Sequence, residues 1–388
     1  MKNQSLEWHE RKMLLLNISA KILPYVFGIA FSLGSYTYVG AVLTLVVSAW
    51  FLALNWKEVL KDKWSLIVIG FFLAITCKDA VAFVLKTESF TAFAKSGSRV
   101  FVLAGSAALL LSYPRKEIEH AFIVGYGIAS AWIALTFVLM RLSIMPWIYN
   151  FNVFGNLSLW FPLLWGAQLY SKGDAKSRRW SVIIFIVSII ILSIDGFGMK
   201  IQGSRTAPLT LAAGFILTLF SDKKASRWLG LAMLIGAVGS IIILSVYFIP
   251  DIDRLLTHRQ ELWQAYWAKA WERPLTGWGW TSVEDNIRLL EPLLRGTTVY
   301  PQLVSVGLGP HNSFLAMFFE NGLFALVGFV AIYLARIVKA SLPLRPLDIA
   351  LIAYIVMISL DAMMAGGLTY LGYFLGVCLL AIDKSTQI

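Results

Sequence analysis

The chain has 388 residues, of which 58% are hydrophobic and 14% charged, and its mean hydropathy is +0.72. A water-soluble domain of this size does not tolerate such a composition, so the bilayer is predicted to be its solvent. The net charge of +11 does not indicate a nucleic-acid partner, because Lys and Arg are spread over short loops between apolar runs. Cys77 and Cys378 lack a CxxC spacing or a His partner, which supports neither a disulfide framework nor a zinc site.

Apolar runs of roughly 15 to 25 residues recur along the chain, each long enough to cross a hydrocarbon core as a helix. They predict an all-α, polytopic integral membrane protein of about twelve transmembrane helices. The predicted spans are residues 13–33, 36–55, 64–85, 99–113, 119–140, 150–170, 180–194, 205–220, 228–249, 311–335, 347–362 and 366–382. Alternate loops are rich in Lys and Arg, which places those loops and both termini in the cytoplasm.

One long loop divides the predicted architecture into three parts. Residues 1–249 hold spans one to nine, residues 250–310 form the loop on the non-cytoplasmic side, and residues 311–388 hold spans ten to twelve and a cytoplasmic tail. Between Pro250 and Pro274 leucines and aromatics recur at helical spacing, and the tryptophans predict a helix along the membrane surface. A second short helix is predicted near Val283–Leu294. A loop of this length marks a functional segment more often than a connector.

Arg259 lies in the apolar stripe of the first loop helix, beside Leu262 and Trp263, and not on the solvent-exposed face of that helix. A cation in that position needs a partner. One interpretation is that its stem follows the apolar surface while its head reaches lipid phosphate or Glu261. The other interpretation is an anion-binding site.

Two further polar residues are predicted at helix N-termini. Arg205 is the first residue of span eight. The helix dipole at this end disfavours a cation unless a bound anion compensates its charge. Arg205 therefore either anchors the helix or helps to hold a diphosphate. His311 opens span ten, with Pro310 suited to the first helical position. The dipole there disfavours imidazolium, so His311 is either a cap or a neutral proton acceptor.

Several ionisable residues fall in the non-cytoplasmic halves of predicted spans, where burying charge is costly and marks sites by default. Lys78 and Asp79 lie in span three, Asp195 ends span seven and Asp361 ends span eleven. Structural pairing of Lys78 and Asp79 with other helices is an equal alternative.

Arginines at helix ends, a neutral His and an amphipathic helix at one surface suggest group transfer from an anionic, lipid-linked donor. The sequence has no Walker A loop and no GxGxxG βαβ unit, so the activated donor must arrive ready-made. It also offers no Asp-x-Asp pair for a divalent metal, and a metal-independent transfer without cofactor is the simpler hypothesis.

At these positions the chain resembles the O-antigen ligase and polymerase superfamily, which includes bacterial protein O-oligosaccharyltransferases. The resemblance rests on four features in order, over roughly residues 200–325: Gly203-Ser-Arg-Thr-Ala207, Arg259-x-x-Leu-Trp263 running to Pro274-Leu-Thr-Gly-Trp-Gly279, His311-Asn-Ser-Phe-Leu315, and Glu320-x-Gly322. The first 190 residues match only in hydropathy. Pro208 and Thr257-His258 depart from the family pattern.

The resemblance implies transfer of a glycan from undecaprenyl diphosphate to a sugar hydroxyl of the lipid A core, at the periplasmic face of a bacterial inner membrane. Arg205 and Arg259 would hold the diphosphate and stabilise it as a leaving group, and His311 would deprotonate the acceptor for an inverting displacement. Lys78, Asp79, Asp195, Glu320 and Asp361 are expected supporting residues. The expected partners are the lipid-linked donor, the lipid A core acceptor and membrane lipids.

Two alternatives remain open at this point. A polymerase would move the glycan to another lipid-linked repeat, but two long outer loops would then be expected. A secondary transporter would show matching interrupted helices in two halves with charge at mid-membrane. Here the charge gathers at one surface and one loop dominates, which favours a ligase, while the lack of a large soluble domain disfavours a protein transferase.

Overall fold

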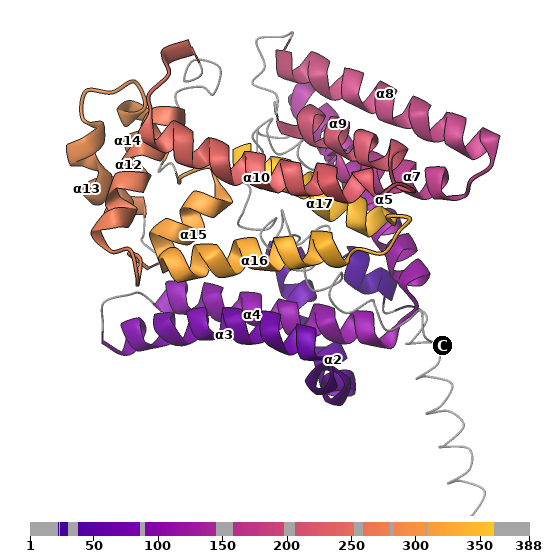
Figure 1. Ribbon diagram of the computed structural model, residues 1–388, viewed down its shortest axis with the longest axis horizontal. Coiled ribbons are helices and arrows are strands. Elements are labelled where there is room, and N and C mark those ends of the chain that lie inside the picture. The colour runs from indigo at the N-terminus through magenta and orange to yellow at the C-terminus, as the bar shows by residue number, and fades with distance from the viewer. Residues whose placement is uncertain are drawn as a thin grey trace, which may run out of the picture.

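The computed structural model describes residues 22, 24–29, 38–85, 90–144, 158–197, 206–251, 259–279, 283–306 and 309–360. Every regular element within these ranges is a helix (Figure 1). The helices are α2 (Tyr38–Lys61), α3 (Lys63–Val84), α4 (Phe90–Ser112), α5 (Arg115–Arg141), α7 (Trp160–Ser171), α8 (Ala175–Phe197), α9 (Thr206–Leu219), α10 (Ala225–Val246), α12 (Arg259–Glu272), α13 (Val283–Leu294), α14 (Tyr300–Val306), α15 (Ser313–Asn321), α16 (Leu323–Lys339) and α17 (Pro346–Leu360).

The described part of the chain contains four helices that are long and apolar enough to cross a bilayer: Val42–Lys61, Lys63–Val84, Arg115–Met140 and Ala225–Val246. Three shorter helices, Val100–Ser112, Thr206–Leu219 and Pro346–Leu360, are also apolar. The all-helical class and the multi-pass membrane character are thereby confirmed. The number of twelve spans remains a prediction, and the predicted spans 13–33 and 366–382 lie wholly or largely outside the described residues.

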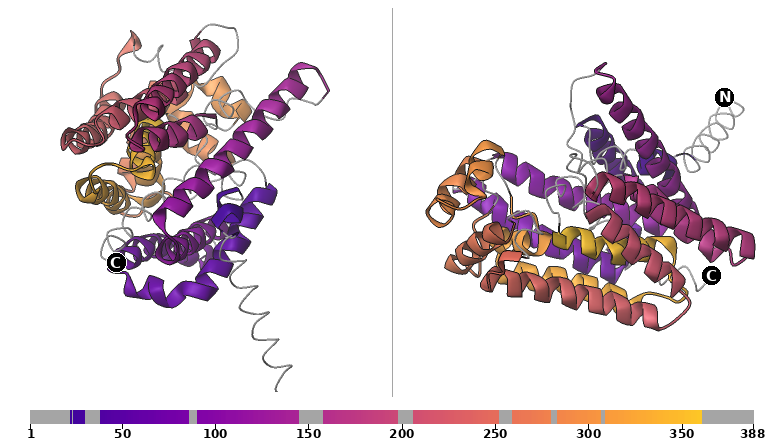
Figure 2. Two further views of the ribbon diagram at one scale, coloured as in Figure 1. Left: turned by 90° about the vertical axis from the view of Figure 1, so that its right-hand side faces the viewer. Right: turned by 90° about the horizontal axis from the view of Figure 1, so that it is seen from above.

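The described part of the long loop includes helices α12, α13 and α14, which lie together at one end of the bundle, on the left in Figure 1. The view from above in Figure 2 shows the same arrangement, with these orange helices gathered at one end. At the other end, the turn after α9 meets the segment before α17, where the Leu344 N–H donates to the Ser221 carbonyl at 3.0 Å. Two loops predicted to be cytoplasmic therefore lie at the same end of the molecule.

Helix α17 forms the centre of the bundle and is buried on all sides, as an α-helix without a polar face must be. It packs against α9, α10 and α7. Its Tyr354 ring lies 5.6 Å from the Trp160 ring of α7, and both side chains are fully buried. Pro346 suits the first helical position because it lacks an N–H that the helix would leave unpaired.

The predicted continuous span 311–335 is wrong, because Gly322 divides it into α15 and α16. Gly322 has φ 85° and ψ 177°, a conformation outside the helical region that favours glycine. A Cβ atom there would stand 2.6 Å from the Leu275 carbonyl carbon. The break thus brings the loop backbone against the start of α16.

Candidate functional site

The C-terminal end of α17 is the point where two of the predicted site segments meet. Arg259, the first residue of α12, donates a hydrogen bond from Nη1 to the carbonyl of Leu360. Asn312, next to His311, donates from Nδ2 to the carbonyl of Ser359 at 2.6 Å. The carbonyls of Ser359 and Leu360, consecutive in the last described turn of α17, therefore bind the Arg259 and His311 segments.

A second contact fixes the same two segments directly to each other. Trp263, one turn after Arg259 on α12, donates from its indole Nε1 to the Pro310 carbonyl at 2.7 Å. Gln260 holds the start of α12 to the end of α10, because its Nε2 donates to the Tyr247 carbonyl at 2.5 Å. Arg259 and the His311 segment therefore lie close together, and their role in one site stays a prediction.

The inward side of α12 packs against protein, whereas Trp271 on the same helix is 50% exposed, so the position of α12 along the membrane surface stays a prediction. Trp263 and Tyr266 are fully buried, and the Tyr266 ring meets Phe319 of α15 at 4.8 Å with perpendicular planes. Burial, with a smaller contribution from Glu320, raises the pKa of the Tyr266 phenol, so this group stays protonated. Glu261, one predicted partner of Arg259, accepts a hydrogen bond from the Thr298 hydroxyl at 2.7 Å.

His311 lies just before α15 and not inside it. The helix begins at Ser313, and Asn312 is its N-cap, whose side-chain oxygen accepts from the Leu315 N–H at 3.0 Å. The prediction of Pro310 at the first helical position is therefore wrong. His311 is 5% exposed and has a positive φ of 50°, an uncommon conformation for a residue other than glycine. Such backbone conformations cluster at functional sites, because the surrounding structure must hold them.

The Pro-Leu-Thr-Gly-Trp-Gly and Glu-x-Gly motifs cross each other as two backbones in close contact. The Trp278 N–H donates to the Phe319 carbonyl at 2.8 Å, and the Leu323 N–H donates to the Pro274 carbonyl at 2.7 Å. Gly277 has φ 66°, and a Cβ atom there would lie 2.5 Å from the Asn321 nitrogen. These glycines are required for the close approach, which gives both motifs a structural role.

Lys78 of α3 fastens this crossing to the transmembrane bundle. Its Nζ donates to the Glu320 carbonyl at 2.9 Å, to Asn321 Oδ1 at 3.1 Å and to the Thr276 carbonyl at 3.2 Å. Asp79 is fully buried, and Lys78 Nζ lies 3.5 Å from its Oδ1. The structural contacts with other elements are those of Lys78 alone, because neither carboxylate oxygen of Asp79 has a hydrogen-bond partner among the described residues. Glu320 takes part through its backbone carbonyl.

The Lys78 cluster is separate from the meeting point at α17. Glu320 is seven residues beyond Ser313 on α15, which at 1.5 Å per residue is about 10 Å along the helix axis. Arg205 and Asp361 lie outside the described residues, immediately before α9 and immediately after α17. Asp195 lies in α8, but its side chain is not described. Asp361 is the next residue in the sequence after Leu360, whose carbonyl accepts from Arg259.

Residues 188–330 match the family model described as O-antigen ligase. This segment, less than half of the 388-residue chain, is similar to that family. The resemblance to the O-antigen ligase and polymerase superfamily is thereby confirmed, and with it a ligase- or polymerase-type function that acts on lipid-linked glycan in a membrane. Searches among curated proteins and among solved structures found no match. Most of the geometry described above, from α12 to the start of α16, lies inside the O-antigen ligase segment.

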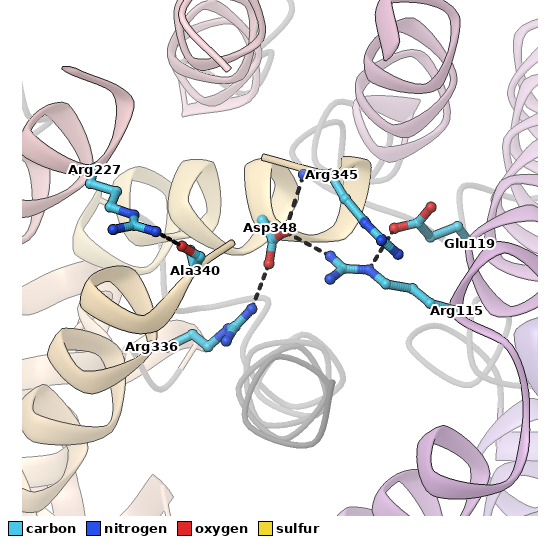
Figure 3. A network of polar contacts seen from close by, with 7 residues as sticks. All are labelled: Arg115, Glu119, Arg227, Arg336, Ala340, Arg345 and Asp348. Carbon is cyan, nitrogen blue, oxygen red and sulfur yellow. Dashed lines mark hydrogen bonds and ion pairs between the residues drawn. The ribbon is translucent and has the colours of Figure 1, made fainter. Parts of the chain in front are cut away.

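At the opposite end of α17 lies a buried charge network that the sequence did not predict (Figure 3). Asp348, 1% exposed, accepts from Arg336 at 2.7 Å and from Arg115 at 2.7 Å. Arg115 also donates to Glu119 at 2.9 Å. Two arginines and two carboxylates balance in formal charge and join α5, α16 and α17. The sequence signal for this network was Asp348, an acid in the first turn of the otherwise apolar helix α17, with Arg336 and Arg345 shortly before it in the sequence.

Proposed function

We propose that this protein is an O-antigen ligase that transfers a glycan from undecaprenyl diphosphate to a sugar hydroxyl of the lipid A core. The observation that supports this most is the convergence of Arg259 and the His311 segment on the C-terminal end of α17. A guanidinium has five N–H donors in a planar fork, so an arginine anchored by a carbonyl can also donate to phosphate oxygens. In this proposal Arg259 and Arg205 hold the diphosphate.

The proposed reaction is a single displacement. His311 accepts the proton of the acceptor hydroxyl, and the acceptor oxygen forms a bond to the anomeric carbon of the donor. The bond from that carbon to the diphosphate oxygen breaks, and undecaprenyl diphosphate leaves with the bonding electrons. The charge that develops on the leaving group is stabilised by the arginines. Attack opposite the leaving group inverts the anomeric configuration.

The proposed location is the inner membrane of a bacterium, with both termini cytoplasmic and the site facing the periplasm. The turn before α10, which carries Lys223 and Lys224, and the segment before α17, which carries Arg345, lie at one end of the bundle, and α12, α13 and α14 lie at the other (Figure 1). The positive-inside rule assigns the end with these basic residues to the cytoplasm. The candidate site belongs to the other end.

The decisive experiment uses the purified full-length chain in proteoliposomes with a lipid-diphosphate-linked glycan, with and without a rough lipopolysaccharide acceptor. A ligase yields glycan joined to the lipid A core only when the acceptor is present. Longer lipid-linked chains formed without the acceptor would instead establish the polymerase alternative. Parallel reactions with EDTA test the metal-independent chemistry: activity lost on chelation and restored by magnesium would contradict it.

A further inference from the structure

A cleft of about 370 Å³ lies on the outer side of the loop helices, between the end of α10, α12 and the end of α13. This volume falls in the range of small-molecule sites. Its lining includes apolar and polar side chains, among them Phe248, Glu261, Gln264, Ala268, Leu293 and Thr297.

The cleft faces away from the meeting point at α17. Successive residues of an α-helix are turned by about 100°, so Glu261, Gln264 and Ala268 lie on the face of α12 opposite Arg259. Burial agrees with this assignment, because Tyr266 and Trp263 on the Arg259 face are buried while Ala268 is exposed. The cleft is therefore a second concave surface on the same helix.

The chemistry of the cleft disfavours an anion. Glu261 is the one charged residue among its described lining residues, and a carboxylate repels phosphate, whether from a lipid head group or from the donor diphosphate. The Thr298 hydroxyl, 2.7 Å from Glu261 Oε2, holds this carboxylate in place. A carboxylate has about four acceptor positions, so it can accept further hydrogen bonds from ligand hydroxyls.

The remaining lining suits a sugar ring. Gln264 is three residues after Glu261 and therefore its neighbour on the helix surface, adding an amide donor and acceptor. Phe248 and Leu293, 47% and 45% exposed, offer apolar surface for the C–H face of a ring. A hydroxyl-rich ligand without charge satisfies both sets of side chains.

We propose that this cleft is a subsite for uncharged sugar residues of a substrate glycan, apart from the place where the diphosphate is held. This inference rests on the proposed function. Two sources share the chemistry: the glycan of the lipid-linked donor and the core oligosaccharide of the acceptor. The subsite would position the glycan at a distance from the reacting bond, contributing to affinity and not to the chemical step.

The test uses saturation-transfer NMR on the full-length protein with two soluble probes, the O-polysaccharide and the core oligosaccharide, each released from lipopolysaccharide by mild acid. The key variant is Ala268→Trp, which fills the cleft from an exposed helical position. Its matched control is Ala225→Trp, the same change at an exposed position at the far end of α10. We expect one probe to bind wild-type protein and Ala225→Trp, with affinity reduced about tenfold or more in Ala268→Trp.

The probe that binds identifies the source of the sugar. Binding should persist in Arg259→Gln, which can still donate to the Leu360 carbonyl, because the cleft is on the opposite face of α12. In transfer assays Ala268→Trp should raise KM for the same substrate and leave kcat unchanged, the pattern of lost uniform binding. If neither probe binds, or if Ala268→Trp binds like its control, the subsite does not exist. Glycan binding to a protein without transfer activity would instead refute the proposed function and leave the subsite standing.

Discussion

Lys78 and Glu320 are 242 positions apart in the sequence, yet the Lys78 ammonium donates to the Glu320 carbonyl at 2.9 Å. With its bonds to Asn321 and Thr276, this lysine ties α3 to the crossing of two loop backbones. A hydrogen bond to a charged group contributes about 1.5–3 kcal/mol. Lys78→Met should therefore lower the free energy of unfolding by at least about 1.5 kcal/mol, because the carbonyls lose their donor.

Thermal unfolding of detergent-solubilised protein, followed by tryptophan fluorescence, measures this effect. Lys63→Met is the matched control, since Lys63 is exposed at the other end of the same helix. A melting temperature of Lys78→Met equal to that of wild type would show that the Lys78 contacts contribute no stability. An equal loss in Lys78→Met and Lys63→Met would point to helix α3 in general.

The glycine at the break between α15 and α16 should tolerate no side chain. Gly322→Ala places a Cβ against the Leu275 carbonyl at φ 85° and ψ 177°, a conformation that alone costs about 1–3 kcal/mol. The collision adds to this, so folded protein recovered by size-exclusion chromatography should fall sharply. Gly236→Ala in α10 is the control, because nothing lies within 4 Å of its added Cβ. Normal recovery of Gly322→Ala would show that the crossing is looser than described.

The buried charge network around Asp348 predicts that replacing this one carboxylate by an amide strongly lowers the stability of the protein. Asp348→Asn keeps the shape but leaves Arg115 and Arg336 without their shared carboxylate, and breaking a buried pair typically costs about 3–5 kcal/mol. Glu58→Gln is the control, because Glu58 forms only an exposed pair with Lys61. The melting temperature should fall strongly for Asp348→Asn and hardly for Glu58→Gln. An unchanged melting temperature for Asp348→Asn would mean that the arginines are satisfied without it.

Arg259 is expected to combine an anchoring role with an electrostatic one, and two substitutions separate them. Arg259→Gln can still donate to the Leu360 carbonyl but has no charge, so it should keep the melting temperature while transfer falls about a hundredfold or more. Arg259→Ala should lower both the melting temperature and the transfer rate. Arg295→Ala, an exposed arginine on the same loop, should change neither. Full transfer activity in Arg259→Gln would remove this residue from the proposed diphosphate site.

Sequence periodicity predicted some features well and others not at all, for physical reasons. The bounds of α13 and the inward position of Arg259 follow from local spacing of apolar residues, which a single helix determines. The break at Gly322 was missed, because apolar residues continue on both sides of it. The partners of Lys78 are mostly carbonyls, which every residue has, so no residue type marked them. Asp348 was passed over because its arginine partners were assigned to solvent-exposed loops.

The assignment of His311 as the proton acceptor is the central claim, and one substitution tests it with little disturbance of the backbone. His311 has φ 50°, and Asn adopts this region more readily than most residues, so His311→Asn should keep the local conformation and remove the ring. General-base catalysis contributes about a hundredfold to ten-thousandfold. The measurement is the transfer rate of His311→Asn together with its dissociation constant for the lipid-linked donor. The account predicts that the rate falls at least about a hundredfold while the dissociation constant stays the same. A rate near that of wild type, or a dissociation constant that rises in proportion to the loss of rate, would contradict it.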